Sequence, residues 1–503
     1  MSERDAILAE EGSGFPGVTY RETVLEHAYD NAKRYLLDAM LAANKAHLSM
    51  LAEQGLVSPA DARAVMSALL DLDVGEIRAS SYTGEFEDLF FHVEHLIHKS
   101  AGEAAGNLHL ARSRNDLGVA MYRMALRDRL LRAERALLAL QSALLAVAEE
   151  HVRAVMPAHT HTQRAQPTTL AHYLVAVHDF LSRDLRRLRA AFDNCNRSPL
   201  GAAALTTSGF TIDRCRLAQL LAFDGLVENS YDAIGGADYL GEVAMALQLS
   251  FLGLGRFVND LLLWSTQEFG AIRLADPYVQ VSSIMPQKRN PVALEHLRSL
   301  LSAGVGDTST VLIMLHNTPF GDVVDTEDDL QPYLWRALEG ADGMYRLLAA
   351  VVGTMEVDVE LLLRRAKEGY STATELADTL VRERGLSFRT AHAVAAAVVE
   401  LAASQGVELE GVSPGLVDRA AESVIGQSVS LSATQVSEAL DPVRFVKIRT
   451  LPGGPAPQET QKALEERRTA HAHEVSIHRQ RAEEISKCLQ DLDALTKEWG
   501  KSV

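Results

Sequence analysis

The chain has 503 residues, 47% of them hydrophobic, so it is long and apolar enough for two or three domains with a sizeable buried core. Its formal net charge of -18 argues against a nucleic-acid partner, because no dense basic cluster opposes the repulsion by phosphates. The three cysteines have neither CxxC spacing nor a companion histidine cluster, which argues against disulfides and a metal site. The acidic N-terminus lacks an apolar signal core, so we expect a cytoplasmic protein.

Helical periodicity dominates the chain, and the alternation typical of strands is almost absent. Apolar residues recur at helical spacing over residues 121–152, which predicts a helix of about 32 residues and roughly 48 Å. Similar long patterns cover residues 170–194, 239–266 and 292–315. We therefore predict an all-α fold built around a bundle of long helices.

The predicted helix over residues 239–266 is apolar on more than one face and must be buried. Either a large monomeric core or an assembly of several subunits would bury it. A membrane span is disfavoured, because Arg256, Asn259 and Asp260 interrupt the apolar stretch.

Three helical regions are expected along the chain: an N-terminal region of residues 1–111, a central long-helix region of residues 112–362 and a C-terminal region of residues 363–503. In the last of these, residues 371–405 are typical of two helices broken at Gly385. Ser387 is the candidate N-cap of the second helix.

The segment of residues 280–291 cannot be regular helix. Pro286 and Pro291 push the residues before them out of the helical region and offer no N-H to a strand ladder, so we expect an exposed, partly extended loop. Lys288 and Arg289 could bind carboxylates, and a serine of lowered pKa could take a proton. From composition alone, a solvated turn is an equally good interpretation.

This loop resembles the signature of the aspartase/fumarase superfamily, Gly-Ser-Ser-x-Met-Pro-x-Lys-x-Asn-Pro, at every position except the opening glycine, which is Val281 here. Further segments resemble the argininosuccinate lyase branch in order and spacing, and the likeness extends from about Tyr29 to Pro457. They are residues 109–116, 156–167, 198–201 with 212–214, and 439–446 with 453–454. The resemblance implies a three-domain fold with a central long-helix bundle, and homotetramers whose active sites are shared between subunits.

What the resemblance implies chemically is a cofactor-free carbon-nitrogen lyase. Such an enzyme splits an N-succinyl amine, that is an N-substituted L-aspartate, reversibly into fumarate and an amine. A base must take the proton from the carbon beta to nitrogen, and cations must hold the aci-carboxylate that develops. By resemblance, Ser282 is the base, and His161 paired with Glu295 donates or supports the donated proton. The residues expected to hold the succinyl carboxylates are Ser113, Arg114, Asn115, Thr160, Ser283, Lys288 and Asn290.

Two of these assignments have simpler structural alternatives. Ser282 could be a turn hydroxyl, and His161 could be a packing residue. The sequence also leaves open whether Ser282 or Ser283 takes the proton.

The chain departs from the branch on the amine side. Where the branch carries a tyrosine, a glutamine and a lysine for the arginine end of its substrate, this chain has Asp322, Glu327 and Leu330. We expect Asp322 or Glu327 to contact a cationic amine, and the acids of residues 327–329 to form a solvated face rather than a metal site. Argininosuccinate is the default substrate. The alternatives are another amine, as in aminopolycarboxylate lyases acting on ethylenediamine disuccinate, or a non-catalytic crystallin-like protein.

Overall fold

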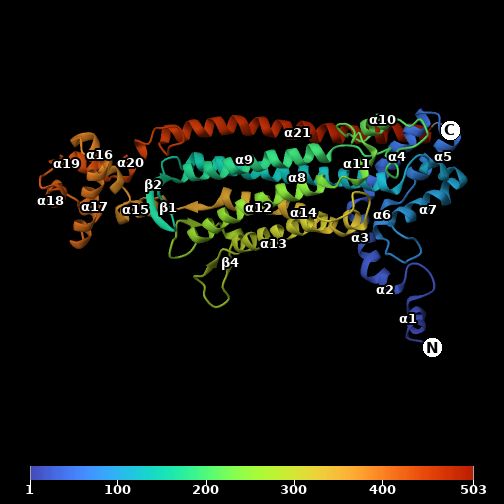
Figure 1. Cartoon of the computed structure of the whole chain (residues 1–503), viewed down its shortest axis with the longest axis horizontal. Coiled ribbons are helices and arrows are strands. Elements are labelled where there is room, and N and C mark those ends of the chain that lie inside the picture. The colour runs from blue at the N-terminus through green and yellow to red at the C-terminus, as the bar shows by residue number, and fades with distance from the viewer. Residues whose placement is uncertain (1, 502–503) are drawn as a thin grey trace.

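Five long helices form the centre of an elongated molecule in the computed structural model, which describes residues 2–501 (Figure 1). The predicted helix over residues 292–315 is reproduced residue for residue, and two others agree to within two residues at each end. The all-α prediction is confirmed. The five helices are α8 (Arg114–Glu150), α9 (Leu170–Cys195), α12 (Asp238–Trp264), α13 (Val292–Leu315) and α14 (Gln331–Thr354).

α8 begins at Arg114, well before the first residue of the apolar pattern at Met121. The start is fixed by a capping box: the Ser113 side chain accepts a backbone N-H from the first turn, and the Asp116 carboxylate accepts the N-H of Ser113 at 2.9 Å. The apolar pattern did not predict this first turn of α8, because the turn begins with the polar residues Arg114, Asn115 and Asp116.

Smaller elements cluster at the two ends of the bundle (Figure 1). One end carries α1 (Glu3–Glu11), α2 (Val18–Tyr20), the π-helix η1 (Arg21–Leu25), α3 (Glu26–Tyr35), α4 (Leu37–Glu53), α5 (Pro59–Leu70), α6 (Val74–Ala79), α7 (Leu89–Ala101), the 3₁₀ helix η2 (Gly102–His109), α10 (Arg214–Leu220) and α11 (Ser230–Gly235). The other end carries α15 (Val359–Lys367), η5 (Glu368–Tyr370), α16 (Ala373–Arg384), α17 (Phe388–Ser404), η6 (Leu409–Gly411), α18 (Pro414–Ile425), α19 (Ala433–Leu440) and α20 (Pro442–Lys447).

Gly385 and Ser387 have the roles expected of them. Gly385 ends α16 at φ 64°, a left-handed conformation that glycine adopts without a Cβ penalty. The Ser387 side chain then caps α17 by accepting the N-H of Thr390.

The last helix, α21 (Pro457–Lys501), returns along the bundle to the N-terminal end (Figure 1). Its residues Leu464, Ile485 and Leu492 are buried in the core shared by the bundle and the N-terminal helices. Ion pairs reinforce this packing, including Arg467 with Asp179 of α9 at 2.9 Å. A separate apolar core lies within residues 376–440. The predicted C-terminal region of residues 363–503 thus contains a small helical body and a helix that packs on the bundle.

Three short antiparallel pairs are the strands among the described residues. They are β1 (Val155–Thr160) with β2 (Gln163–Thr169), β3 (Ile272–Arg273) with β6 (Glu356–Val357), and β4 (Gln280–Val281) with β5 (Arg289–Asn290). The 3₁₀ helix η3 (Asp276–Tyr278) precedes β4, and the π-helix η4 (Asp325–Asp329) precedes α14. Periodicity gave no sign of the β1-β2 hairpin.

One face of α12 stays uncovered in a single chain, although the sequence predicts full burial. Met245, Leu249 and Leu252 are 53%, 45% and 51% exposed, and Ile313 of the neighbouring α13 is 71% exposed. By length and composition, α12 is the one helix of the described chain that could cross a membrane, but 44% of its most apolar window is already buried.

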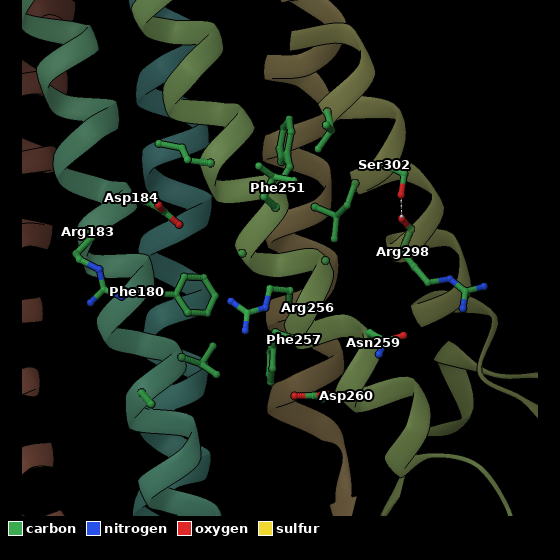
Figure 2. Close-up of a pocket in the computed structure, with 18 of the residues that line it drawn as sticks. Phe180, Arg183, Asp184, Phe251, Arg256, Phe257, Asn259, Asp260, Arg298 and Ser302 are labelled. Atoms are coloured by element: carbon green, nitrogen blue, oxygen red, sulfur yellow. Dashed lines mark hydrogen bonds between the residues drawn. The ribbon is translucent and has the colours of Figure 1, made fainter. Parts of the chain in front are cut away.

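The same face is hollowed by a groove of about 900 Å³ between α9, α12 and α13. Phe180 and Asp184 of α9 point into it, and Arg256 of α12 lies opposite Phe180 (Figure 2). A groove that mixes apolar and paired charged side chains suits contact with another protein surface better than contact with lipid.

Gly304 permits the close packing of α13 on α12. A Cβ at this position would lie 2.7 Å from the ring of Phe251, which is 1% exposed and has no room to move. We expect Gly304→Val to lower the free energy of unfolding by about 1–3 kcal/mol through overpacking, measured by thermal or denaturant unfolding. The matched control is Gly343→Ala within α14, where a Cβ meets nothing within 4 Å and helix propensity favours alanine. Equal stability of the two variants would contradict this account of the α12-α13 contact.

Candidate active site

The capped start of α8 gathers three of the predicted binding residues. Ser113 is the N-cap, and Arg114 and Asn115 open the first turn, where unpaired backbone N-H groups and the helix dipole favour an anion. The buried Asp116 fixes this turn by accepting the backbone N-H groups of Gly201 at 2.8 Å and Ala203 at 3.1 Å. The segment of residues 198–201, selected by resemblance, is therefore a support of this turn.

Arg112 does not face this site. Its side chain is 7% exposed, it donates to Asn44 at 2.8 Å, and burial lowers its pKa to about 10. Arg112 is a structural residue here.

Arg114 is already paired in this structure. Its guanidinium lies 3.0 Å from Glu87 and 3.2 Å from Asp88, and it stacks over the ring of Phe91 at 5.0 Å. Asp88 is itself the N-cap of α7. The sequence analysis did not select Glu87 or Asp88 as site residues. The available signal was the position of Asp88 as a helix N-cap, with Glu87 directly before it.

Asp322 meets the fumarate-side residues directly. Its carboxylate accepts a hydrogen bond from the Asn115 amide across 207 positions of sequence. The structure thus brings a predicted amine-side residue against a predicted carboxylate-side residue. Leu330 is different: it is fully buried in the core and faces no ligand, so its replacement of a lysine acts on packing.

Glu327 lines the same cavity as Arg114, and its pKa lies well above that of an ordinary glutamate. Partial burial, together with the neighbouring charges of Asp322 and Asp328, raises its pKa to about 7. The pKa of Asp322 is raised by burial as well, although its bond from Asn115 opposes that rise. We expected the acids of residues 327–329 to be solvated. Asp328 and Asp329 are exposed, but Glu327 is only partly so, and both Glu327 and Asp328 line a cavity.

The loop of residues 280–291 has the exposed, extended form that the prolines predict. It is a hairpin between β4 and β5 that projects from the bundle before α13 (Figure 1). The Ser282 Oγ accepts the backbone N-H groups of Met285 at 3.1 Å and Ile284 at 3.4 Å. Two donors aimed at one hydroxyl oxygen would stabilise its alkoxide.

The basic residues of this loop have different environments. Arg289 is tied to Asp276 at 2.6 Å and to the carbonyl of Leu274 at 2.9 Å, so it anchors the loop. Lys288 is exposed, and its backbone carbonyl accepts the N-H of Ser282 at 3.4 Å. Ser283 is exposed, and Asn290 lies in β5 at the start of α13.

Thr160 and His161 lie on the tight turn of the β1-β2 hairpin. His161 and Thr162 adopt φ of 51° and 62°, left-handed values that are costly without glycine and that occur often at functional turns. The hairpin is held to the small helical body by Arg164 with Glu368 at 2.9 Å. His161 is exposed, and within residues 2–501 no ion pair joins it to Glu295, the carboxylate expected to partner it.

One chain does not bring the three groups together. α8 has 37 residues and separates Arg114 from the hairpin by about 55 Å at 1.5 Å per residue. α13 has 24 residues and separates Asn290 from the Asp322 segment by about 36 Å. The hairpin and the β4-β5 loop lie towards one end of the bundle, and the start of α8 lies at the other end (Figure 1).

Two family models match the chain: a lyase model over residues 39–306 and an argininosuccinate lyase C-terminal model over residues 370–447. The argininosuccinate lyase 2 of Agrobacterium fabrum is 40% identical over 456 residues, covering 90% of each chain. The argininosuccinate lyase of Methanosarcina barkeri is 38% identical over 453 residues, covering 89% of each.

Solved structures share the fold. EDDS lyase in complex with formate matches with a TM-score of 0.86 at 29% identity, over 99% of each chain. A fumarate lyase:delta crystallin from Brucella melitensis, at 20% identity and a TM-score of 0.69, covers 85% of this chain and 94% of its own, and shows the fold alone.

The long-helix bundle with its exposed Ser-Ser-x-Met-Pro loop therefore defines a lyase of the fumarate-releasing class. More narrowly, the chain belongs to the argininosuccinate lyase branch of the aspartase/fumarase superfamily and is a carbon-nitrogen lyase.

The raised pKa of Glu327 predicts a pH-dependent stability. A carboxyl whose folded pKa is about 7 binds its proton more tightly than in the unfolded chain, so stability falls as pH rises from about 4.5 through 7. The negative charges of Asp88, Asp322 and Asp328 raise the pKa of Glu327, and the positive charge of Arg114 lowers it. We expect Glu327→Gln to raise the unfolding temperature at pH 8 and to leave it unchanged at pH 4.5, in calorimetric scans. An equal change in unfolding temperature at pH 8 and pH 4.5 would show that the charge on Glu327 is not the cause.

Proposed function

We propose that the enzyme releases fumarate from argininosuccinate or a closely related N-substituted L-aspartate, and can run the addition in reverse. The single observation that carries this proposal is the loop oxygen of Ser282, held by two backbone N-H groups beside the signature lysine. The argininosuccinate lyases at 38% and 40% identity support argininosuccinate as the first substrate to test.

In the proposed mechanism, Ser282 takes the proton from the carbon beta to nitrogen. The two loop N-H groups and the exposed Lys288 stabilise its alkoxide, and Lys288 with Asn290 also faces the aci-carboxylate that develops. His161 gives a proton to the departing nitrogen, aligned by Glu295. Every step uses side chains of this sequence.

We further propose that each active site is assembled from several subunits of a homotetramer. In one chain, about 55 Å of helix separates the start of α8 from the hairpin, and about 36 Å separates Asn290 from the Asp322 segment, which no loop closure can bridge. The uncovered apolar face of α12 and α13 offers a surface on which copies of the chain would pack, with the groove of Figure 2 along it. A cytoplasmic location belongs to the same proposal.

A second candidate substrate class is the one named by the EDDS lyase structures. Their TM-score of 0.86 over 99% of the chain and the acids Asp322 and Glu327 favour an amine other than arginine. Incubating the enzyme with fumarate and a panel of amines that includes arginine, and following loss of fumarate absorbance, distinguishes the two. No fumarate loss with any amine, and none formed from argininosuccinate, would overturn the proposed function.

The base is tested by single substitutions in the loop. We expect Ser282→Ala to lower kcat by at least about a thousandfold with a nearly unchanged KM, because proton transfer is lost while the carboxylate contacts remain. Ser283→Ala is the comparison variant: Ser283 is exposed and accepts no N-H of the described loop, and because Ser283 is expected to bind a carboxylate, the variant should raise KM while kcat is largely kept. Should Ser283→Ala be the inactive variant, the base is Ser283.

Subunit sharing is tested by mixing two inactive variants. Asn115→Ala and His161→Ala should each be nearly inactive as homotetramers, because every site lacks one group. Refolding them together should restore about a quarter of native activity in the mixed tetramers, since some sites then draw both native residues from different chains. No recovery despite subunit exchange, checked by native mass spectrometry, would place both residues in one chain's site.

A further inference from the structure

A cavity of about 180 Å³ opens where the N-terminal helices and η4 meet the first turns of α8. Four carboxylates line it, against one guanidinium, that of Arg114. The four acids are Glu87, Asp88, Glu327 and Asp328. Apolar side chains such as Leu36, Met40 and Met121 line the remainder.

The single cation of the cavity wall is already used. Arg114 forms its ion pairs with Glu87 and Asp88. Among the described residues, Glu327 and Asp328 have no ion pair, and the more distant charge of Arg114 offsets theirs only in part. The mutual repulsion of Asp322, Glu327 and Asp328 raises the pKa of Glu327, on top of the effect of burial. A positive charge in the cavity would offset the repulsion among these carboxylates and lower the pKa of Glu327 towards its ordinary value.

Tyr122 is an independent sign of a ligand. Its side chain is 6% exposed and lines the cavity, and its hydroxyl makes no hydrogen bond with any described residue. Because no hydrogen bond within the described protein occupies this hydroxyl, its oxygen and proton are available to a group that enters the cavity.

The cavity also has aromatic walls. Phe15 and Tyr20, whose ring centroids lie 5.9 Å apart, come from the N-terminal segment, and Tyr29 and Phe90 come from α3 and α7. Aromatic faces together with uncompensated carboxylates suit an organic cation better than a hydrated metal ion.

We propose that this cavity binds a cationic group on the amine half of the substrate, an ammonium or guanidinium joined to the reacting nitrogen through a short apolar chain. Glu327 and Asp328 neutralise that group, the Tyr122 oxygen accepts one of its N-H groups, and Asp322 positions Asn115 behind them. A carboxylate in the same place would be repelled by the acids. Of the two substrate classes proposed above, the cavity therefore favours a dibasic amine without a carboxylate at that end over arginine, whose far end carries one. This inference rests on the proposed function and names the substrate class of that site.

Three matched amines, each supplied with fumarate, test the proposal. 1,4-Diaminobutane carries the second cation, 1-aminopentane replaces it by a methyl group of similar size, and ornithine adds a carboxylate to the diamine. We expect kcat/KM to fall at least about tenfold from the diamine to either of the other two. The double variant Glu327→Gln, Asp328→Asn should remove the preference over 1-aminopentane, and Tyr122→Phe should lower it several-fold. Asp325→Asn, which removes an acid of η4 outside the cavity, should keep the full preference.

A binding measurement separates this proposal from the proposed function. 1,4-Diaminobutane alone should raise the unfolding temperature of the native enzyme and of Asp325→Asn, and should leave that of the double variant unchanged. Binding without any fumarate turnover would uphold the cation site and overturn the proposed function. Turnover with no preference among the three amines, and no diamine-induced shift, would overturn the cation site alone.

Discussion

The length and rigidity of α8 constrain everything else in this molecule. Its capping box fixes Arg114 and Asn115 at one end, and its 37 residues carry the chain about 55 Å to the hairpin of Thr160 and His161. No rearrangement within one chain brings those ends together. This separation is the basis of the proposed homotetramer, in which the uncovered face of α12 and α13 would carry the contacts between chains.

The same architecture divides the chemistry into two halves with different demands. The fumarate half of the proposed reaction needs groups that hold two carboxylates and a base for one C-H, and we propose that the loop of residues 280–291 and the start of α8 supply them. The amine half varies with the substrate. In this chain we place it in an acidic cavity with aromatic walls, where Glu327 has no ion pair and the Tyr122 hydroxyl has no hydrogen bond among the described residues.

Prediction from sequence succeeded where the signal is local. Periodicity located α9, α12 and α13, glycine and serine placed the break between α16 and α17, and prolines predicted the extended loop. It failed at the β1-β2 hairpin, which is local but has no alternating pattern. It also failed where a contact spans the chain: Leu330 proved to be a core residue, and α21 packs on the bundle through buried residues spaced along a mostly polar helix.

The sequence by itself determined the helical class and the signature loop, and it supplied the residues proposed to act on fumarate, because each depends on neighbouring residues or on a motif of fixed spacing. Only the tertiary structure decided that Arg114 is paired with Glu87 and Asp88, that Asp322 holds Asn115, and that the predicted site residues of one chain lie far apart. Those facts depend on distances between segments separated by tens to hundreds of residues, which rigid helices set and composition cannot express.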